Sequence, residues 1–298
     1  MNAEHEVSTA EILRAVKRVQ LRTRKAVTDM VAGGFRSSFR GSGMEFEEVR
    51  EYVPGDEVRS IDWNVTARTG RPYVKKFVEE REQTVFLVHD LSASTRLGSN
   101  TRAVRAAAAE LAAILGFSAI GSGDRVGYLG ITDRVELELP PRSGTRQAFR
   151  IVREALYTET AGRGTDLALA ADHLLRVLKR RAYVFVLSDF LAEGFARKLA
   201  MLSRRHDVVA LRLVDPLHQA LPAAGLLRWE DPETGELFLV DSSSRRVREA
   251  FAEQAAARAE NVRMLMRGRG IDLVDVPVGA SVVDPLVAYL HLRERRRS

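Results

Sequence analysis

An aspartate and two serines stand at alternating positions just after an apolar run, where a strand would deliver them to a binding site. The apolar run covers residues 84–88, and Asp90, Ser92 and Ser94 follow it. An unbroken apolar run is typical of a strand inside a parallel sheet, and ligands of such sheets lie beyond the carboxyl ends of the strands. The three side chains therefore carry oxygen atoms to the edge of the sheet where a ligand would bind.

Two further loops are predicted to bring oxygen atoms to the same edge. Asp189 follows a second apolar run at residues 183–187, and Thr165 lies in a glycine-containing loop that opens a predicted helix. Hydroxyl and carboxylate oxygens suit hard divalent cations, and Mg²⁺ keeps several waters in a near-octahedral shell. The set predicts a site for Mg²⁺, or for Mn²⁺ or Ca²⁺, with a position open for an acid from outside. Asp166 is an alternative ligand, and the serines could instead cap the next turn.

Strands and helices alternate along most of the chain. This alternation, with acids at strand ends, predicts an α/β fold with a doubly wound, mostly parallel sheet of the Rossmann type. Strands are expected at residues 84–89, 125–132, 135–139, 183–187, 208–214 and 271–276, and helices at residues 101–120, 145–157, 167–180, 195–205, 242–267 and 284–293. Residues 81–298 are expected to form this domain. It would include a hairpin turn at 231–235, serines that cap the helix from residue 242, and a frayed basic tail from Arg293.

Residues 1–80 are expected to form a separate N-terminal part. It begins with an amphipathic helix at residues 9–31, whose polar face is rich in arginine and lysine, and continues as an irregular segment. A basic amphipathic helix can lie on a membrane surface, and a basic surface can bind nucleic acid. We expect instead that the helix packs on the body of the protein with its arginines in solvent.

The composition is that of a globular protein. Of 298 residues, 45% are hydrophobic and 29% are charged, the net charge is +6, and there is no cysteine. No stretch approaches the roughly 18 apolar residues of a membrane span, and the first residues do not resemble a signal peptide. The absence of cysteine excludes disulfides and thiolate metal sites. These features predict a cytoplasmic protein. No nucleic-acid partner is expected, because no nucleic-acid-binding motif accompanies the basic charge, whereas peripheral membrane contact stays open.

Acids and arginines alternate around a tryptophan within the irregular segment. A Pro-Gly-Asp turn at residues 54–56 lies in the middle of this stretch. Such a pattern could form a rigid latch held by a buried or half-buried ion-pair network. It could also be a docking surface, because tryptophan and arginine are enriched in interface hot spots. The candidate docking residues are Arg50, Tyr52, Asp56, Arg59, Asp62, Trp63 and Arg68.

The spacing Asp90-x-Ser92-x-Ser94, with Thr165 and Asp189 on later loops, resembles the metal-ion-dependent adhesion site of von Willebrand factor A domains. The segment upstream is more specific. Residues 41–46, 50–56, 59, 61–63 and 67–68 resemble the hallmark of a bacterial family called domain of unknown function fifty-eight. Its members carry a von Willebrand A-like domain and are associated with MoxR-type AAA+ ATPases. The resemblance covers about residues 30–210, and many members have membrane helices that this chain lacks.

The resemblance implies that Mg²⁺ is presented to a carboxylate of a partner protein. The serines and Thr165 would bind the ion directly and the two aspartates through water, and the segment at residues 50–68 is expected to pack close to Asp90. The function expected is therefore that of a non-enzymatic adaptor or co-chaperone of a MoxR-type ATPase, which helps to remodel an unknown client. The chain has no Gly-x-x-x-x-Gly-Lys-Ser/Thr loop, so ATP chemistry would come from the partner.

Two alternatives remain open at this point. One is a nucleic-acid or membrane-surface binder that works through the basic N-terminal helix. The other is a Mg²⁺-dependent hydrolase, because an acid at a strand end with Mg²⁺ can support phosphoryl transfer. A phosphatase of the haloacid dehalogenase type would need an aspartate in place of Ser92. His89 is expected to point to the opposite face of the strand from Asp90.

Overall fold

A six-stranded sheet forms the centre of the computed structural model, which describes residues 9–32, 44–79, 82–93, 104–230 and 236–297. The strand order is β10-β7-β6-β3-β4-β5, and all neighbours run parallel except β4 and β5. The strands are β3 (Thr84–Asp90), β4 (Arg125–Ile131), β5 (Val135–Arg142), β6 (Tyr183–Ser188), β7 (Asp207–Val214) and β10 (Asp272–Pro277). The predicted doubly wound, mostly parallel sheet is confirmed.

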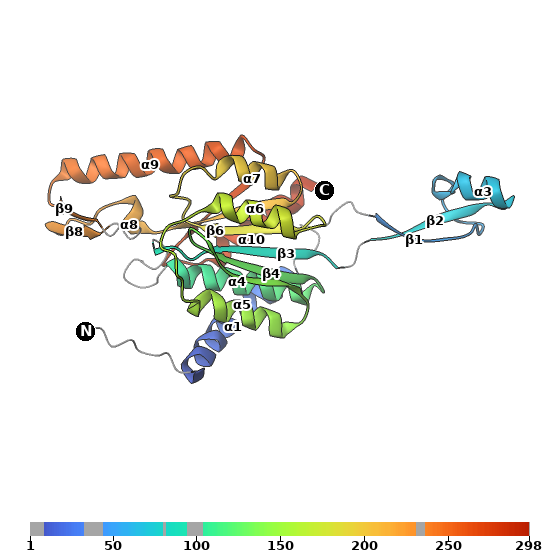
Figure 1. Ribbon diagram of the computed structural model, residues 1–298, viewed down its shortest axis with the longest axis horizontal. Coiled ribbons are helices and arrows are strands. Elements are labelled where there is room, and N and C mark those ends of the chain that lie inside the picture. Colours follow the sequence, from blue (N-terminus) through green and yellow to red (C-terminus); the bar gives the residue numbers. More distant parts are fainter. Residues whose placement is uncertain (1–8, 33–43, 80–81, 94–103, 231–235, 298) are drawn as a thin grey trace.

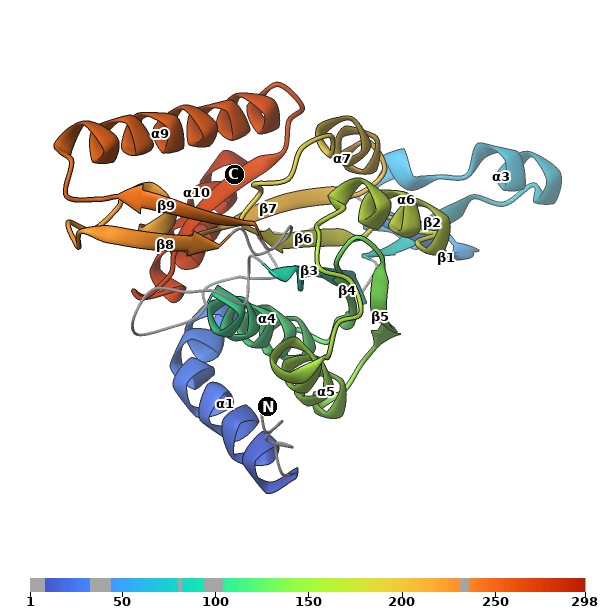
Figure 2. The same ribbon diagram turned by 60° about the vertical axis from the view of Figure 1, so that its left-hand side comes forward.

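Helices cover both faces of this sheet (Figure 2). One face packs on α4 (Val104–Gly121), α5 (Thr145–Tyr157) and α10 (Val283–Arg297), and the other on α6 (Leu167–Val177), α7 (Ala196–Ser203) and α9 (Arg245–Arg267). Strand β3 shows how the sequence produces two cores. Its side chains alternate between the faces, so Leu87 faces the first core while Phe86 and Val88 face the second.

The chain changes direction across the sheet beside β3. After β3 it adds β4 and β5 on one side, and then returns to place β6 and β7 on the other side. In a doubly wound sheet this reversal opens a crevice at the carboxyl ends of the two central strands. The fold therefore brings the ends of β3 and β6 together at the place where such sheets bind ligands.

The helix α1 (Thr9–Ala32) packs on α4 and α5, as its apolar face predicts. Val16, Ala26 and Met30 are buried, whereas Lys17 and Arg18 are exposed. α4 is long and apolar enough to cross a membrane by composition alone, but 72% of it is buried inside the protein. Within the described residues it is the one helix of this kind, and its burial is that of a core helix.

Residues 44–79 form an arm with a sheet of its own, which the sequence pattern did not predict beyond an extended stretch at its end. Strand β1 (Met44–Glu51) pairs antiparallel with β2 (Tyr73–Glu79). Between them lie the 3-10 helix η1 (Val58–Ser60) and helix α3 (Trp63–Thr69). Figure 1 shows the arm extending away from the end of the main sheet.

A second hairpin agrees with the predicted one, whereas the helices α9 and α10 correct two expectations. Strands β8 (Leu226–Glu230) and β9 (Leu237–Asp241) follow the short α8 (Pro216–Gln219), and the predicted turn at 231–235 lies outside the described residues. α9 starts after Ser244, whose side chain makes no capping bond. The expected frayed tail is wrong as well, because α10 continues to Arg297 and buries Arg293.

Candidate metal centre

Asp90 ends β3 as a fully buried carboxylate with both oxygens engaged. Its Oδ1 accepts a hydrogen bond from the backbone N–H of Ser92 at 3.0 Å. Its Oδ2 accepts one from the hydroxyl of Ser188, the last residue of β6, at 2.6 Å. Ser92 is also fully buried. The loop after β3 therefore holds its carboxylate and serine in fixed positions against the end of β6.

Asp189 follows β6 and lies at the same edge of the sheet. Its Oδ1 accepts a hydrogen bond from the backbone N–H of Leu191 at 3.0 Å. Its Oδ2 is buried and has no hydrogen-bond partner among the described residues. A buried carboxylate oxygen without a partner is costly, and an ion in the site would satisfy it.

The backbone beside Asp189 carries a local strain. Phe190 adopts a φ of 56°, a conformation that side-chain-bearing residues rarely take, while its N–H donates to the hydroxyl of Ser188 at 3.0 Å. The Phe190 ring packs edge-on against Phe195 at 5.6 Å between ring centroids. Such a conformation costs about 1–3 kcal/mol and is concentrated at functional sites.

The loop that carries Thr165 reaches the same place. The carbonyl of Arg163 accepts a hydrogen bond from the N–H of Ala93 at 2.9 Å, which joins this loop to the one after β3. Gly162 packs so tightly on the turn after β4 that an added Cβ would lie 2.2 Å from the hydroxyl of Thr132. Only glycine fits there, and this close approach fixes the path of the chain toward Thr165.

The alternative ligand, Asp166, has a structural task. Its Oδ1 accepts a hydrogen bond from the N–H of Leu169 at 2.8 Å and so caps the start of α6. Aspartate is a favoured residue at this position because it satisfies a free helix N–H. The structure thus brings together the loops of Asp90, Ser92, Thr165 and Asp189, while Ser94 lies outside the described residues.

The electrostatics of the centre favour a bound cation. Burial and, to a smaller extent, the nearby charge of Asp189 raise the pKa of Asp90 to about 7, although the hydrogen bonds from Ser188 and Ser92 act to lower it. A divalent cation would offset both the burial and the repulsion of the two carboxylates. The residues present therefore fit such an ion. The described residues contain no cluster of three or more His, Asp or Glu side chains that could bind a metal, so the hydroxyls would have to complete the shell.

His89 does not support the hydrolase alternative, in which it would serve as a general base. It is fully buried on the other side of β3, and its Nδ1 lies 2.9 Å from the hydroxyl oxygen of Tyr128. Burial, with a smaller contribution from the charge of Arg105, lowers the pKa of His89 to about 3. It is a neutral core residue, as its place on the strand predicts.

Ser188 is the residue at this edge that the sequence pattern did not single out. It donates to Asp90 and accepts from Phe190, so it links the two acidic loops. A signal was present, because Ser188 ends the apolar run directly before Asp189 and so stands at the same strand end as the acid.

The arm lies away from this centre, which contradicts the expectation that residues 50–68 pack close to Asp90. The arm joins the chain before Thr84, at the amino end of β3, while Asp90 closes its carboxyl end. The six steps from Thr84 to Asp90 along β3 put about 20 Å between these ends at about 3.3 Å per residue. Figure 1 shows the arm beyond the opposite end of the sheet from the β8–β9 hairpin.

Four of the candidate docking residues hold the arm in shape. Arg50 pairs with Asp56 through two contacts of 2.6 and 2.8 Å, and Asp56 also accepts from the N–H of Val53. The hydrogen bond from Arg50 is the main reason that the pKa of Asp56 is lowered. Asp62 caps α3 by accepting from the N–H groups of Asn64 and Val65. The backbone N–H of Tyr52 donates to the carbonyl of Pro72.

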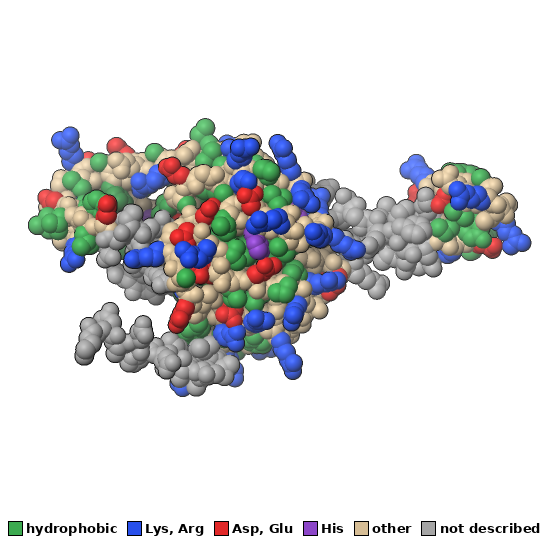
Figure 3. Space-filling model, in the orientation of Figure 1, with side chains coloured by type: hydrophobic (Ala, Val, Ile, Leu, Met, Phe, Trp, Pro, Cys, Tyr) green, Lys and Arg blue, Asp and Glu red, His purple; other side chains and the backbone are tan. Residues whose placement is uncertain are grey.

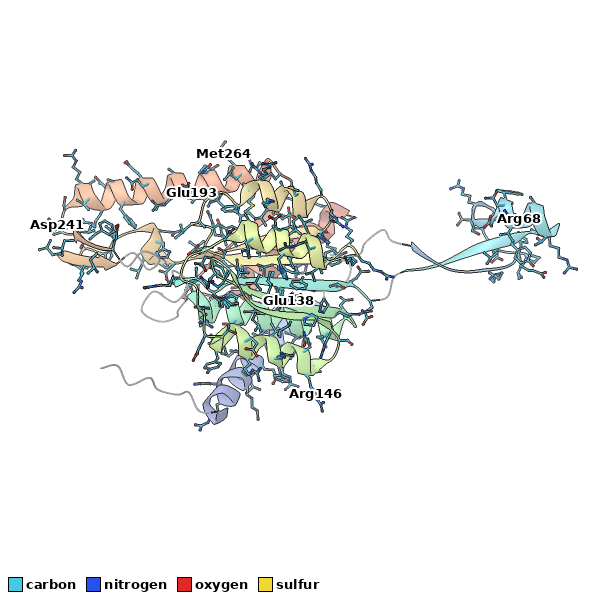
Figure 4. The ribbon with its side chains drawn as sticks, in the orientation of Figure 1. Arg68, Glu138, Arg146, Glu193, Asp241 and Met264 are labelled. Atoms are coloured by element: carbon cyan, nitrogen blue, oxygen red, sulfur yellow. The ribbon has the colours of Figure 1, made fainter. Side chains whose placement is uncertain are left out.

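The remaining candidates point outward. Trp63 is 67% exposed, so the tryptophan is not part of a buried network, and Val53 and Val58 of the same arm are exposed as well. Arg59 and Arg68 are exposed as well, and Arg68 is labelled on the arm in Figure 4. Apolar and basic side chains share the surface of the arm in Figure 3.

Comparison with known proteins gives relatives over nearly the whole chain. Residues 48–261 match the family described as protein of unknown function DUF58. Uncharacterized proteins of Mycobacterium bovis and Mycobacterium tuberculosis are each 31% identical over 295 residues, covering 97% of this chain and 92% of theirs. Among solved structures, the conserved hypothetical protein BatB from Bacteroides thetaiotaomicron matches 72% of this chain and 100% of its own. Its TM-score is 0.45 and its identity 17%. An aerotolerance-related membrane protein from Bacteroides fragilis covers 72% and 99%, with a TM-score of 0.44 and 15% identity.

Proposed function

This chain belongs to the family described as protein of unknown function DUF58, and from that premise we propose that it is a non-enzymatic module that binds a partner carboxylate through a divalent metal ion. One observation carries the proposal: two buried carboxylates, Asp90 and Asp189, meet at the ligand-binding edge, and one oxygen of Asp189 has no partner among the described residues. When bound, Mg²⁺ would supply an open coordination position for an acid. Asp90, Ser92, Ser94, Thr165 and Asp189 would hold it.

The acidic partner is a client in this proposal, and the second partner is a MoxR-type AAA+ ATPase. The resemblance of residues 41–68 to this family motivates the second partner. The layout supports an adaptor, because the arm and the metal centre lie at opposite ends of β3. One surface can hold the ATPase while the other holds the client.

A pull-down from purified components tests the client half of this proposal. The protein is immobilised in the presence of Mg²⁺ and incubated with a MoxR-type AAA+ ATPase that has been purified together with its clients. The experiment is done with and without a chelator. We expect the client to be released by the chelator and retained by the variant Asp166→Asn. Client binding that is insensitive to the chelator would contradict the metal-dependent mechanism.

Replacing Trp63 by alanine is expected to weaken binding of the ATPase by about 30-fold, the loss typical of a tryptophan hot spot of about 2 kcal/mol. The free protein should keep its unfolding free energy within about 0.5 kcal/mol, because the side chain is 67% exposed. Biolayer interferometry measures the first quantity and urea unfolding the second. The control is Leu239→Ala, which removes a side chain of 78% exposure on the other hairpin. If the two variants bind the ATPase with equal affinity, the arm does not bind the ATPase.

A second candidate function, contact with an anionic surface, is favoured by one observation. The outer side of α1 presents Lys17, Arg18, Arg24 and Lys25, and the adjacent α5 presents Arg146 and Arg150, all exposed. Basic side chains also line the lower edge of the body in Figure 3. Binding to vesicles with anionic lipids that disappears between 50 and 200 mM salt would support it, since such binding is electrostatic.

A further inference from the structure

A pocket opens beside the metal centre and shares Asp189 with it. Its volume is about 460 Å³, within the range of about 300–1,000 Å³ that ligand pockets span. Its walls are the loop after β6, the end of β7 with α8, and the inner side of α9. Figure 4 shows Glu193, from the loop, below α9, and Met264 on the opposite, outer side of that helix.

Apolar side chains from three elements line this pocket. Phe190, Leu191 and Phe195 come from the loop after β6, Val214 from the end of β7, and Val262 and Leu265 from α9. The strained φ of 56° at Phe190 lies in the loop that forms both the pocket wall and the position of Asp189. The same few residues therefore shape the pocket and the metal centre.

The charged groups on the pocket wall divide into engaged and peripheral ones. Arg212 is buried and makes two contacts of 2.7 Å with Asp275, as well as one with the carbonyl of Ala259. Asp215 caps α8 by accepting from the N–H of Leu217 at 2.8 Å. Glu193 and Arg258 are exposed at the rim. His218, Gln219 and Asn261 add polar groups to the wall, so the pocket combines an apolar patch with polar groups and with charge at its edge.

We infer that this pocket receives a bulky apolar side chain of the same partner segment whose carboxylate meets the metal ion. The inference rests on the proposed function and names the partner's chemistry: an acidic residue with an aromatic or leucine side chain within about one to three positions. An extended chain advances about 3.3–3.6 Å per residue, so neighbouring side chains can reach a centre and a pocket that share one residue. Asp189 belongs both to the pocket wall and to the metal centre, and this shared residue supports a single partner segment that occupies both.

Short blocked peptides test the inference with the full chain. One labelled peptide holds a single aspartate in a glycine background, and others add a phenylalanine one to three positions away on either side. In Mg²⁺, fluorescence anisotropy should show that at least one phenylalanine peptide binds tenfold or more tightly than the glycine peptide. The chelator should abolish binding of all peptides.

Two variants on one helix make the matched pair. Ala255→Trp fills the pocket from α9, whereas Ala256→Trp puts the same side chain on an exposed position of α9 that does not line it. We expect Ala255→Trp to erase the tenfold preference for phenylalanine and to leave binding of the glycine peptide unchanged. Ala256→Trp should change neither.

The outcomes separate this inference from the function on which it rests. Metal-dependent binding of the glycine peptide without any preference for phenylalanine would overturn the pocket inference alone. Absence of metal-dependent binding for every peptide would overturn the proposed function and the inference together. If Ala255→Trp keeps the tenfold preference for phenylalanine, the apolar side chain does not bind in this pocket, and the inference is wrong.

Discussion

Between pH 5 and pH 8, the metal-free protein is expected to lose on the order of 3 kcal/mol of stability through Asp90, and the variant Asp90→Asn should lack this loss. Burial and the charge of Asp189 raise the pKa of Asp90 from 3.8 to about 7 in the folded state. A carboxyl group with a raised pKa stabilises the fold fully below its unfolded pKa. That contribution disappears as the pH rises through about 7, so most of it is lost in this window.

The difference between the two proteins is the readout, because a buried histidine acts in the opposite direction. The pKa of His89 is lowered from 6.5 to about 3, so its contribution is present above pH 6.5 and is lost as the pH falls. The wild-type profile alone therefore sums opposing effects. Urea unfolding in EDTA at pH 5 and at pH 8 gives the change in unfolding free energy for the wild type and for Asp90→Asn. Any cost of the asparagine itself is the same at both pH values, so it cancels in the change measured for the variant. Equal changes in the two proteins would refute the raised pKa of Asp90.

Replacing Arg293 by methionine is expected to cost about 3–5 kcal/mol of unfolding free energy, because Asp207, whose side chain is only 12% exposed, loses its buried charge partner. The Arg293 guanidinium is buried and pairs with Asp207 and with Asp272, the first residues of β7 and β10. It also donates to the hydroxyl of Tyr289. Loss of this arginine would release α10 from the amino ends of two strands. Urea unfolding measures the effect as a shift of the midpoint.

Arg296→Met is the matched control on the same helix. Arg296 lies 3.7 Å from Asp272, but its side chain is 63% exposed, and exposed pairs contribute about 0–1 kcal/mol. The double variant Arg293→Met with Asp207→Leu should recover part of the stability, since it also removes the carboxylate that lost Arg293 as its partner. An Arg293→Met protein as stable as Arg296→Met would show that this network does not anchor α10.

The centre of the sheet could be predicted from the sequence because β3 and β6 are apolar runs at whose ends an acid stands. The runs before Asp90 and Asp189 gave both the strands and the edge at which their side chains meet. The role of Asp166 was harder to predict, since an aspartate before a helix can cap that helix or bind a metal ion. The hydrogen bond to Leu169 shows the cap.

Two errors have different causes, and only the first comes from a contact between residues distant in sequence, which leaves no local pattern. The basic run from Arg293 reads as a solvated tail, yet its partner Asp207 lies in another strand 86 positions away. The arm was expected near Asp90 because it precedes that strand. The direction of β3 alone, followed from Thr84 to Asp90, would have placed it at the opposite end.

Calorimetric titration with Mg²⁺ and Mn²⁺ at pH 8 tests the metal centre most directly. The account predicts one ion bound by the wild type, no binding by Asp90→Asn or Asp189→Asn, and unimpaired binding by Asp166→Asn, whose asparagine can still cap α6. The wild type should also gain about 2.7 kcal/mol of stability when the ion is at 100 times its dissociation constant. Binding to Asp90→Asn with wild-type affinity would contradict the account.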